Sequence, residues 1–111
     1  MNITVKYAVN VGRLREAIAK FPVAVSAAVK KSAFDIQDTA QALAPVDTGY
    51  LAGSITSTIE KFYAEIEPAA EYAAYVEFGT RKMEAQPFMR KSVDMHGPKF
   101  VAAIEEIMKG M

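Results

Sequence analysis

Residues 22–49 read PVAVSAAVKKSAFDIQDTAQALAPVDTG, and the architecture of the chain follows from them. Their apolar side chains recur at helical spacing and form one stripe: Val25, Val29, Ala33, Ile36, Ala40 and Leu43. Pro22 suits the first turn of a helix, and Pro45 disfavours helix at the residue before it. The sequence therefore predicts a helix from about 22 to 44, with its stripe packed on one face of an antiparallel sheet.

Upstream of this helix, the sequence predicts a strand and a shorter helix. Residues 2–9 alternate polar and apolar side chains, which is the period of a strand with one buried face. Asn10 can cap a helix, and the apolar residues of the segment 11–21 recur at spacings of three and four. Because proline lacks an N–H and clashes with the preceding turn, we expect a kink at Pro22.

Downstream, residues 45–53 form a tight loop by composition. Asp47 and Thr48 can close side-chain turns, and Gly49 can take a positive φ, so we expect Pro45 and these residues to fix the shape of the loop. The triplet 47–49 is also the active-site triplet of retroviral-type aspartic proteases. In those proteins it follows an apolar strand in a nearly all-β chain, whereas here it follows a helix and a proline, which favours a structural turn.

The second half of the chain predicts a hairpin and further helices. Segments 54–60 and 62–67 read as two strands, and residues 71–78 as either a short helix or a strand, with Gly79 suited to a helix C-cap. Residues 80–86 suggest an exposed loop. Pro87 suits a helix that Gly97-Pro98 should break, and a last helix should span about 98–109.

These segments together predict a single α+β domain over residues 1–111. We expect a small antiparallel sheet packed against one long kinked N-terminal helix, with short C-terminal helices.

Composition removes several classes of function. The 13 basic residues balance 13 acidic ones, so the electrostatic term that drives nucleic-acid binding is missing. Cysteine is absent and histidine occurs once, at His96, which excludes thiolate metal sites and Cys-His pairs. We expect His96 to be a solvated loop residue, and we predict no metal or cofactor. No apolar run approaches the roughly 20 residues of a membrane span, and the start of the chain lacks a signal-peptide core, which favours a cytosolic protein.

Two features are candidates for contact with a partner. Phe34 lies opposite the apolar stripe of its helix, on a face that should be in water, and is either a singly exposed aromatic or a subunit contact. Arg81, Lys82 and Met83 lie in the 80–86 loop. The loop is either an ordinary solvated segment or a contact element.

Three segments in order carry a resemblance to a known family. They are residues 44–55 (APVDTGYLAGSI), residues 72–80 (YAAYVEFGT) and residues 86–90 (QPFMR). Their order and spacing resemble the tailed-phage neck and tail-completion proteins of the Hong Kong 97 type over nearly the whole chain. The break at Gly97-Pro98 departs from that family, whose terminal helix is often unbroken.

The resemblance implies a structural protein of the virion or of a prophage, assembled in the cytoplasm of the bacterial host. It implies a homo-oligomeric ring, hexameric in such proteins, at the head-tail junction, where it helps join the tail to the capsid. Its partners would be the connector or adaptor and the tail terminator or tube, with DNA passing through the channel. It implies no catalysis. The alternatives from the residues are a small α+β hydrolase or toxin using Asp47, Glu77 or His96, and a nucleic-acid-binding accessory protein that the net charge disfavours.

Overall fold

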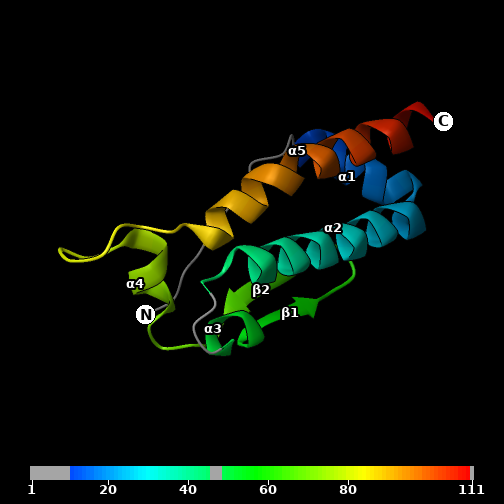
Figure 1. Ribbon diagram of the computed structural model, residues 1–111. Coiled ribbons are helices and arrows are strands. Elements are labelled where there is room, and N and C mark those ends of the chain that lie inside the picture. Colours follow the sequence, from blue (N-terminus) through cyan, green and yellow to red (C-terminus); the bar gives the residue numbers. More distant parts are fainter. Residues whose placement is uncertain (1–10, 46–48, 111) are drawn as a thin grey trace.

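The described part of the protein, residues 11–45 and 49–110 of a computed structural model, consists of helices and one hairpin (Figure 1). The elements are α1 (Val11–Lys20), α2 (Pro22–Leu43), α3 (Tyr50–Gly53), β1 (Ile55–Ile59), β2 (Ala64–Pro68), α4 (Ala73–Phe78) and α5 (Phe88–Lys109). The α+β class is confirmed. The strand expected over residues 2–9, and the side chains of Asp47 and Thr48, lie outside the described residues.

The first two helices break where the proline predicts. Phe21 leaves the helical conformation, with φ −136°, and Pro22 occupies the first turn of α2, where its missing N–H has no helical partner to lose. At the other end, Ala44 is extended, as expected for the residue before a proline. The kink and both ends of the long helix are therefore confirmed.

The stripe of α2 is buried over most of its length but not all of it. Val25, Val29, Ala33 and Ala40 are buried, and Ile36 is half-buried. Leu43 is 40% exposed, which corrects the expectation that it belongs to the core. It is the last residue of α2, and at this end of the helix Ala40 and Ala44 are the residues that pack into the core.

The hairpin is confirmed, and residues 71–78, which the sequence left open, contain the helix α4. β1 and β2 pair antiparallel from Ile55 opposite Pro68 to Ile59 opposite Ala64. α2 lies between this hairpin and α5 (Figure 1), and its most extensive contacts are with α5 rather than with the sheet. The expected packing of α2 on the sheet thus describes only one of its two interfaces.

The prediction of short C-terminal helices is wrong, because α5 is a single helix of 22 residues with Pro98 inside it. A proline here removes the backbone bond to the carbonyl of Asp94 and costs about 3 kcal/mol. The buried face of α5 nevertheless continues on both sides of it, through Ser92, Gly97 and Ile104. Packing along α2 therefore outweighs the local breaker.

His96 is part of this continuous helix, which corrects its expected place in a solvated loop. It is half-buried, and its Nε2 lies 2.6 Å from the hydroxyl oxygen of Thr39 on α2. Its Nδ1 is buried and has no hydrogen-bond partner among the described residues. The histidine links the two long helices.

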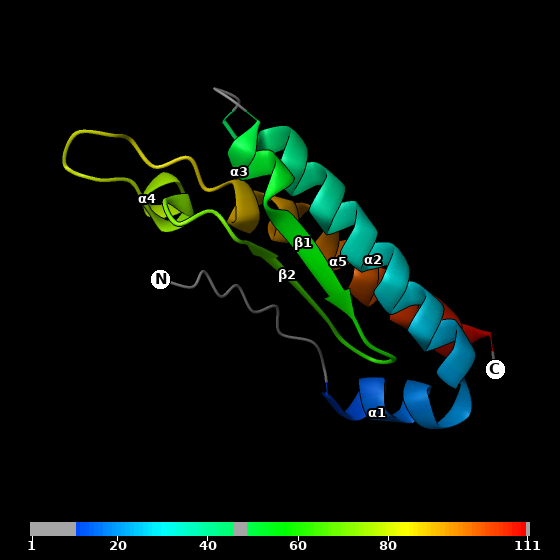
Figure 2. The same ribbon diagram turned by 90° about the horizontal axis from the view of Figure 1, so that it is seen from below.

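The molecule is elongated and has two hydrophobic clusters. Its radius of gyration of 15.5 Å exceeds the roughly 13 Å expected for a compact domain of this length. One cluster, which includes Leu51, Ile55 and Phe88, joins α3, α4 and the start of α5. The other, built on Ala17, Val25, Val29 and Ile104, joins α1 to the far ends of α2 and α5 (Figure 2).

Candidate assembly surface

α4 has an unusual distribution of side chains, because its largest apolar residues face outward. Tyr72, at its N-cap, and Tyr75 and Phe78 are 41%, 52% and 66% exposed. The residues between them are the buried ones: Ala73, Ala74, Val76 and Glu77. The small side chains thus pack inward, and the three aromatic side chains remain on the outside of the molecule.

Tyr50 of α3 adds a fourth exposed aromatic side chain beside Tyr72. Its ring lies 6.1 Å from that of Tyr72, with 30° between the ring planes, which is within the range of attractive aromatic pairs. We call Tyr50, Tyr72, Tyr75 and Phe78 the aromatic surface. It gathers aromatic side chains from two segments that are far apart in the sequence.

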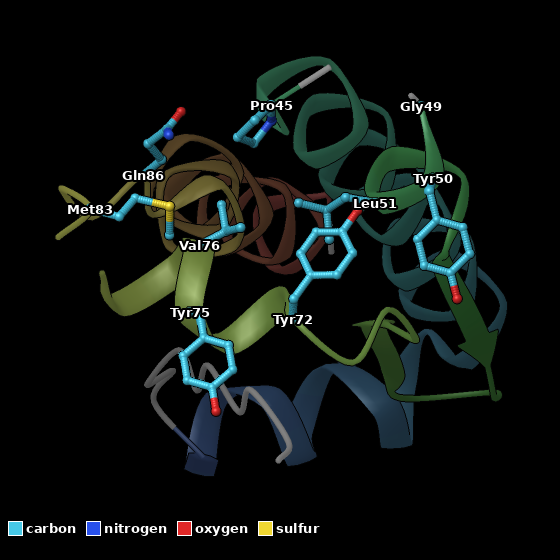
Figure 3. A pocket seen from close by; sticks show the side chains of 9 residues that line it. All are labelled: Pro45, Gly49, Tyr50, Leu51, Tyr72, Tyr75, Val76, Met83 and Gln86. Atoms are coloured by element: carbon cyan, nitrogen blue, oxygen red, sulfur yellow. The ribbon is translucent and has the colours of Figure 1, made fainter. Parts of the chain in front are cut away.

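A pocket of about 300 Å³ opens beside the aromatic surface. Its wall consists of Pro45, Gly49, Tyr50, Leu51, Tyr72, Tyr75, Val76, Met83 and Gln86 (Figure 3). The buried Leu51 and Val76 supply apolar wall, while the tyrosine rings stand at the outside. The sequence-predicted Pro45, Gly49 and Met83 are thus brought together in a hollow whose described lining residues include no Asp, Glu, His, Lys or Arg.

Glu77 of α4 joins this helix to the start of α5. It is 3% exposed, and its carboxylate accepts hydrogen bonds from the backbone N–H groups of Met89, at 3.0 Å, and Arg90, at 3.3 Å. These donors lie in the first turn of α5, where no helical acceptor is available and where negative charge is favoured. Both oxygens are engaged in capping, which gives this buried carboxylate a structural explanation rather than the catalytic one weighed from the sequence.

Gly79 fixes the start of the loop that follows α4. Its φ is +77°, and a Cβ there would lie 2.8 Å from the backbone nitrogen of Ala85 and 2.9 Å from the carbonyl oxygen of Met83. Only glycine satisfies both the backbone conformation and this close approach. Gly49, with φ +76°, has the positive φ that the sequence predicts.

The 80–86 loop is ordered by its own hydrogen bonds. The hydroxyl of Thr80 accepts from the backbone N–H groups of Lys82 and Met83, and the N–H of Gln86 donates to the carbonyl of Val76 at 2.8 Å. The loop projects from the body of the molecule beyond α4 (Figures 1 and 2). The loop therefore projects from the molecule in a conformation that its hydrogen bonds fix.

The interface candidates from the loop fall into two groups. Arg81 and Lys82 are exposed, and neither has an ion-pair partner within the described part of the chain. Met83 is half-buried against the cluster that includes Leu51 and Phe88, so it anchors the loop to the core. The two cationic side chains of the loop are therefore exposed to solvent, while its methionine packs against the core.

Phe34 lies apart from these residues, on α2. It is 47% exposed, as its position opposite the stripe predicts, and it does not line the pocket. The aromatic surface is the feature that sequence reasoning missed. The signal was present, because Tyr72, Tyr75 and Phe78 recur at every third residue.

Tests for two other kinds of site are negative within residues 11–45 and 49–110. No group of three or more His, Asp or Glu side chains there could hold a metal ion. None of the described helices combines the length and the apolar character that crossing a membrane requires.

Comparison with known proteins supports the phage resemblance. The family described as "Bacteriophage HK97-gp10, putative tail-component" matches residues 10–79, which is more than half of the chain. No curated protein and no solved structure gives a significant match. The match includes α1 to α4 and thus the whole aromatic surface, and it ends at Gly79. The chain belongs to the HK97 gp10 family of bacteriophage tail components.

Proposed function

We propose that this phage tail component acts at the head-tail junction, where it assembles as a ring and helps join the tail to the capsid connector. In this proposal residues 1–111 form one domain, the ring is hexameric, and the protein is incorporated into the virion after assembly in the host cytoplasm. The neighbours would be the connector or adaptor on one side and the tail terminator or tube on the other, with DNA in the central channel.

The aromatic surface is the observation that carries this proposal. Four large aromatic rings are exposed beside an apolar pocket. Such a surface is typical of partner-binding sites, because these are enriched in tyrosine and phenylalanine. A protein that served only as a soluble monomer would gain nothing from placing Phe78 outward and Ala74 inward on the same short helix. A subunit that docks on a neighbour gains apolar contact area from that arrangement.

The carboxylate chemistry weighed as an alternative has no support in the described residues. Glu77 caps a helix with both of its oxygens, and His96 contacts Thr39 between two helices. Neither lines the pocket beside the aromatic surface. A structural role is therefore the better account of the polar groups as well as the apolar ones.

A substitution of Phe34, which lies on α2 away from the aromatic surface, tests the proposal at a second part of the molecular surface. In the phage or prophage that carries the gene, Phe34→Asp should leave the fold intact, because the side chain is already half in water. If Phe34 lies in a subunit contact, the new charge would enter an apolar interface, and separate heads and tails should accumulate. Ala27→Asp, an exposed position two helical turns earlier, controls for the added charge alone.

Electron microscopy of the lysates measures the outcome. Removal of the gene should itself yield separate heads and tails if the protein works at the junction. Joined particles at the wild-type yield without the gene would overturn the proposed function. Joined particles with Phe34→Asp alone would remove only Phe34 from the interface.

A further inference from the structure

We propose that the 80–86 loop of one copy docks on the aromatic surface of the neighbouring copy, with Arg81 and Lys82 against the tyrosine rings. This inference rests on the proposed ring, since it names the contact that would build it. The occupant of the aromatic surface is thus a second copy of this chain.

The chemistry of the two surfaces is complementary. Arg81 and Lys82 are exposed and have no ion-pair partner within the described residues, and Tyr72 and Tyr75 are 41% and 52% exposed. A guanidinium or ammonium over an aromatic face gains about 0.5–1 kcal/mol when exposed and about 2 kcal/mol or more when desolvated. Burying this contact between subunits would desolvate it and so raise its interaction energy towards the larger value.

The anchoring of the loop favours a neighbour over the loop's own subunit. Gly79, the Thr80 hydroxyl and the bond from Gln86 to Val76 fix both ends of the loop on α4. Met83 is held in the core cluster, while the segment carrying the two cations projects beyond the body of the molecule (Figure 2). An element built to stand away from its own surface is available to another copy.

The proposed contact is heterologous, because a loop meets an aromatic surface and not another loop. Repeating one heterologous contact produces a ring when the rotation closes. The aromatic surface and the loop root lie on the same end of the elongated molecule (Figures 1 and 2), so neighbouring copies would touch through one end. This leaves the end formed by α1 and the hairpin turn outside the contact.

Cross-linking can test this contact cleanly, because the chain contains no cysteine. Glu84→Cys places a thiol on the loop, and Glu71→Cys places one beside Tyr72. Both positions are exposed, and neither glutamate is among the side chains proposed to meet across the contact, which are Arg81, Lys82 and the tyrosines. Particles are assembled in the host from a mixture of the two single-cysteine proteins and treated with a short bis-maleimide. Peptide mass spectrometry then identifies which cysteines are joined.

The expected result is a dominant 71–84 cross-link, which in this mixture can form only between copies. A chain carrying both substitutions should give a ladder of oligomers that ends at the ring size. Cross-links only of the 71–71 or 84–84 type, or none between copies, in particles that contain the protein would overturn the loop contact and leave the proposed function standing. Absence of the protein from assembled particles would overturn both.

A second measurement tests the cations themselves. Arg81→Ala with Lys82→Ala should reduce the 71–84 cross-link at least tenfold, whereas Lys109→Ala, an exposed cation at the end of α5, should leave it unchanged. An undiminished cross-link in the double variant would show that the cations do not hold the loop in place.

Discussion

The two ends of the molecule are built differently. At the α4 end, ten buried residues of the described part of the chain form a continuous cluster, a buried carboxylate caps α5, and a glycine fixes the loop. At the α1 end, the cluster has four buried residues among those described and depends on half-buried neighbours such as Leu14, Phe62 and Phe100. The end with the denser core is also the end with the exposed aromatic surface. Rigidity therefore coincides with the candidate contact, as expected where a surface must be organised before it binds.

The largest expected effect is loss of the core at the α4 end. Phe88→Ala removes the largest fully buried side chain and should lower the free energy of unfolding by about 3–5 kcal/mol. Ile104→Ala, at the α1 end, should cost nearer the lower limit of the roughly 2–5 kcal/mol range, because its half-buried neighbours can close the cavity. Denaturant unfolding measures both values. A larger loss from Ile104→Ala would reverse the comparison between the ends.

The next effect concerns the buried cap. Glu77→Ala leaves the N–H groups of Met89 and Arg90 without their acceptor and should cost about 1–3 kcal/mol. Glu77→Gln retains one carbonyl acceptor and should cost less. Equal losses for the two variants in thermal unfolding would mean that packing, and not hydrogen bonding, explains the buried carboxylate.

An effect of similar size is expected where the backbone is constrained. Gly79→Ala forces a side chain into positive φ and against the backbone of Ala85, so we expect a loss of about 1–3 kcal/mol and displacement of the loop. Gly53→Ala is the matched control, because its added Cβ would meet nothing within 4 Å and its φ is not positive. Amide chemical shifts of residues 80–86 should change in the first variant only.

The smallest effect is electrostatic. Lys31 donates a 2.8 Å hydrogen bond to Asp35, which lowers the pKa of that carboxyl below its ordinary value, while partial burial opposes the shift. A carboxyl whose folded-state pKa is lowered stabilises the fold above its unfolded pKa, and that contribution disappears as the pH falls through the folded-state pKa. Lys31→Ala should raise the Asp35 pKa in an NMR titration with little change in stability, since the pair is exposed.

The features that could be predicted best from the sequence are those that depend on residues adjacent along the chain. Pro22 and Pro45 bounded α2, and the positive φ of Gly49 followed from its place in a turn. The sequence failed at Gly97-Pro98, because the buried face that keeps α5 continuous is created by packing against α2. It also missed the aromatic surface, since the outward direction of Tyr75 depends on which side of α4 meets the core.

Paired aspartate substitutions at the two ends test the central claim most directly. Tyr75→Asp places a charge on the aromatic surface, whereas Val23→Asp replaces an 83% exposed side chain in the first turn of α2, where an acidic residue is favourable. Both proteins should unfold at wild-type denaturant concentrations. We expect Tyr75→Asp to reduce joined phage particles at least tenfold and Val23→Asp to leave their number unchanged. Wild-type particle yield with Tyr75→Asp would contradict an assembly role for the aromatic surface.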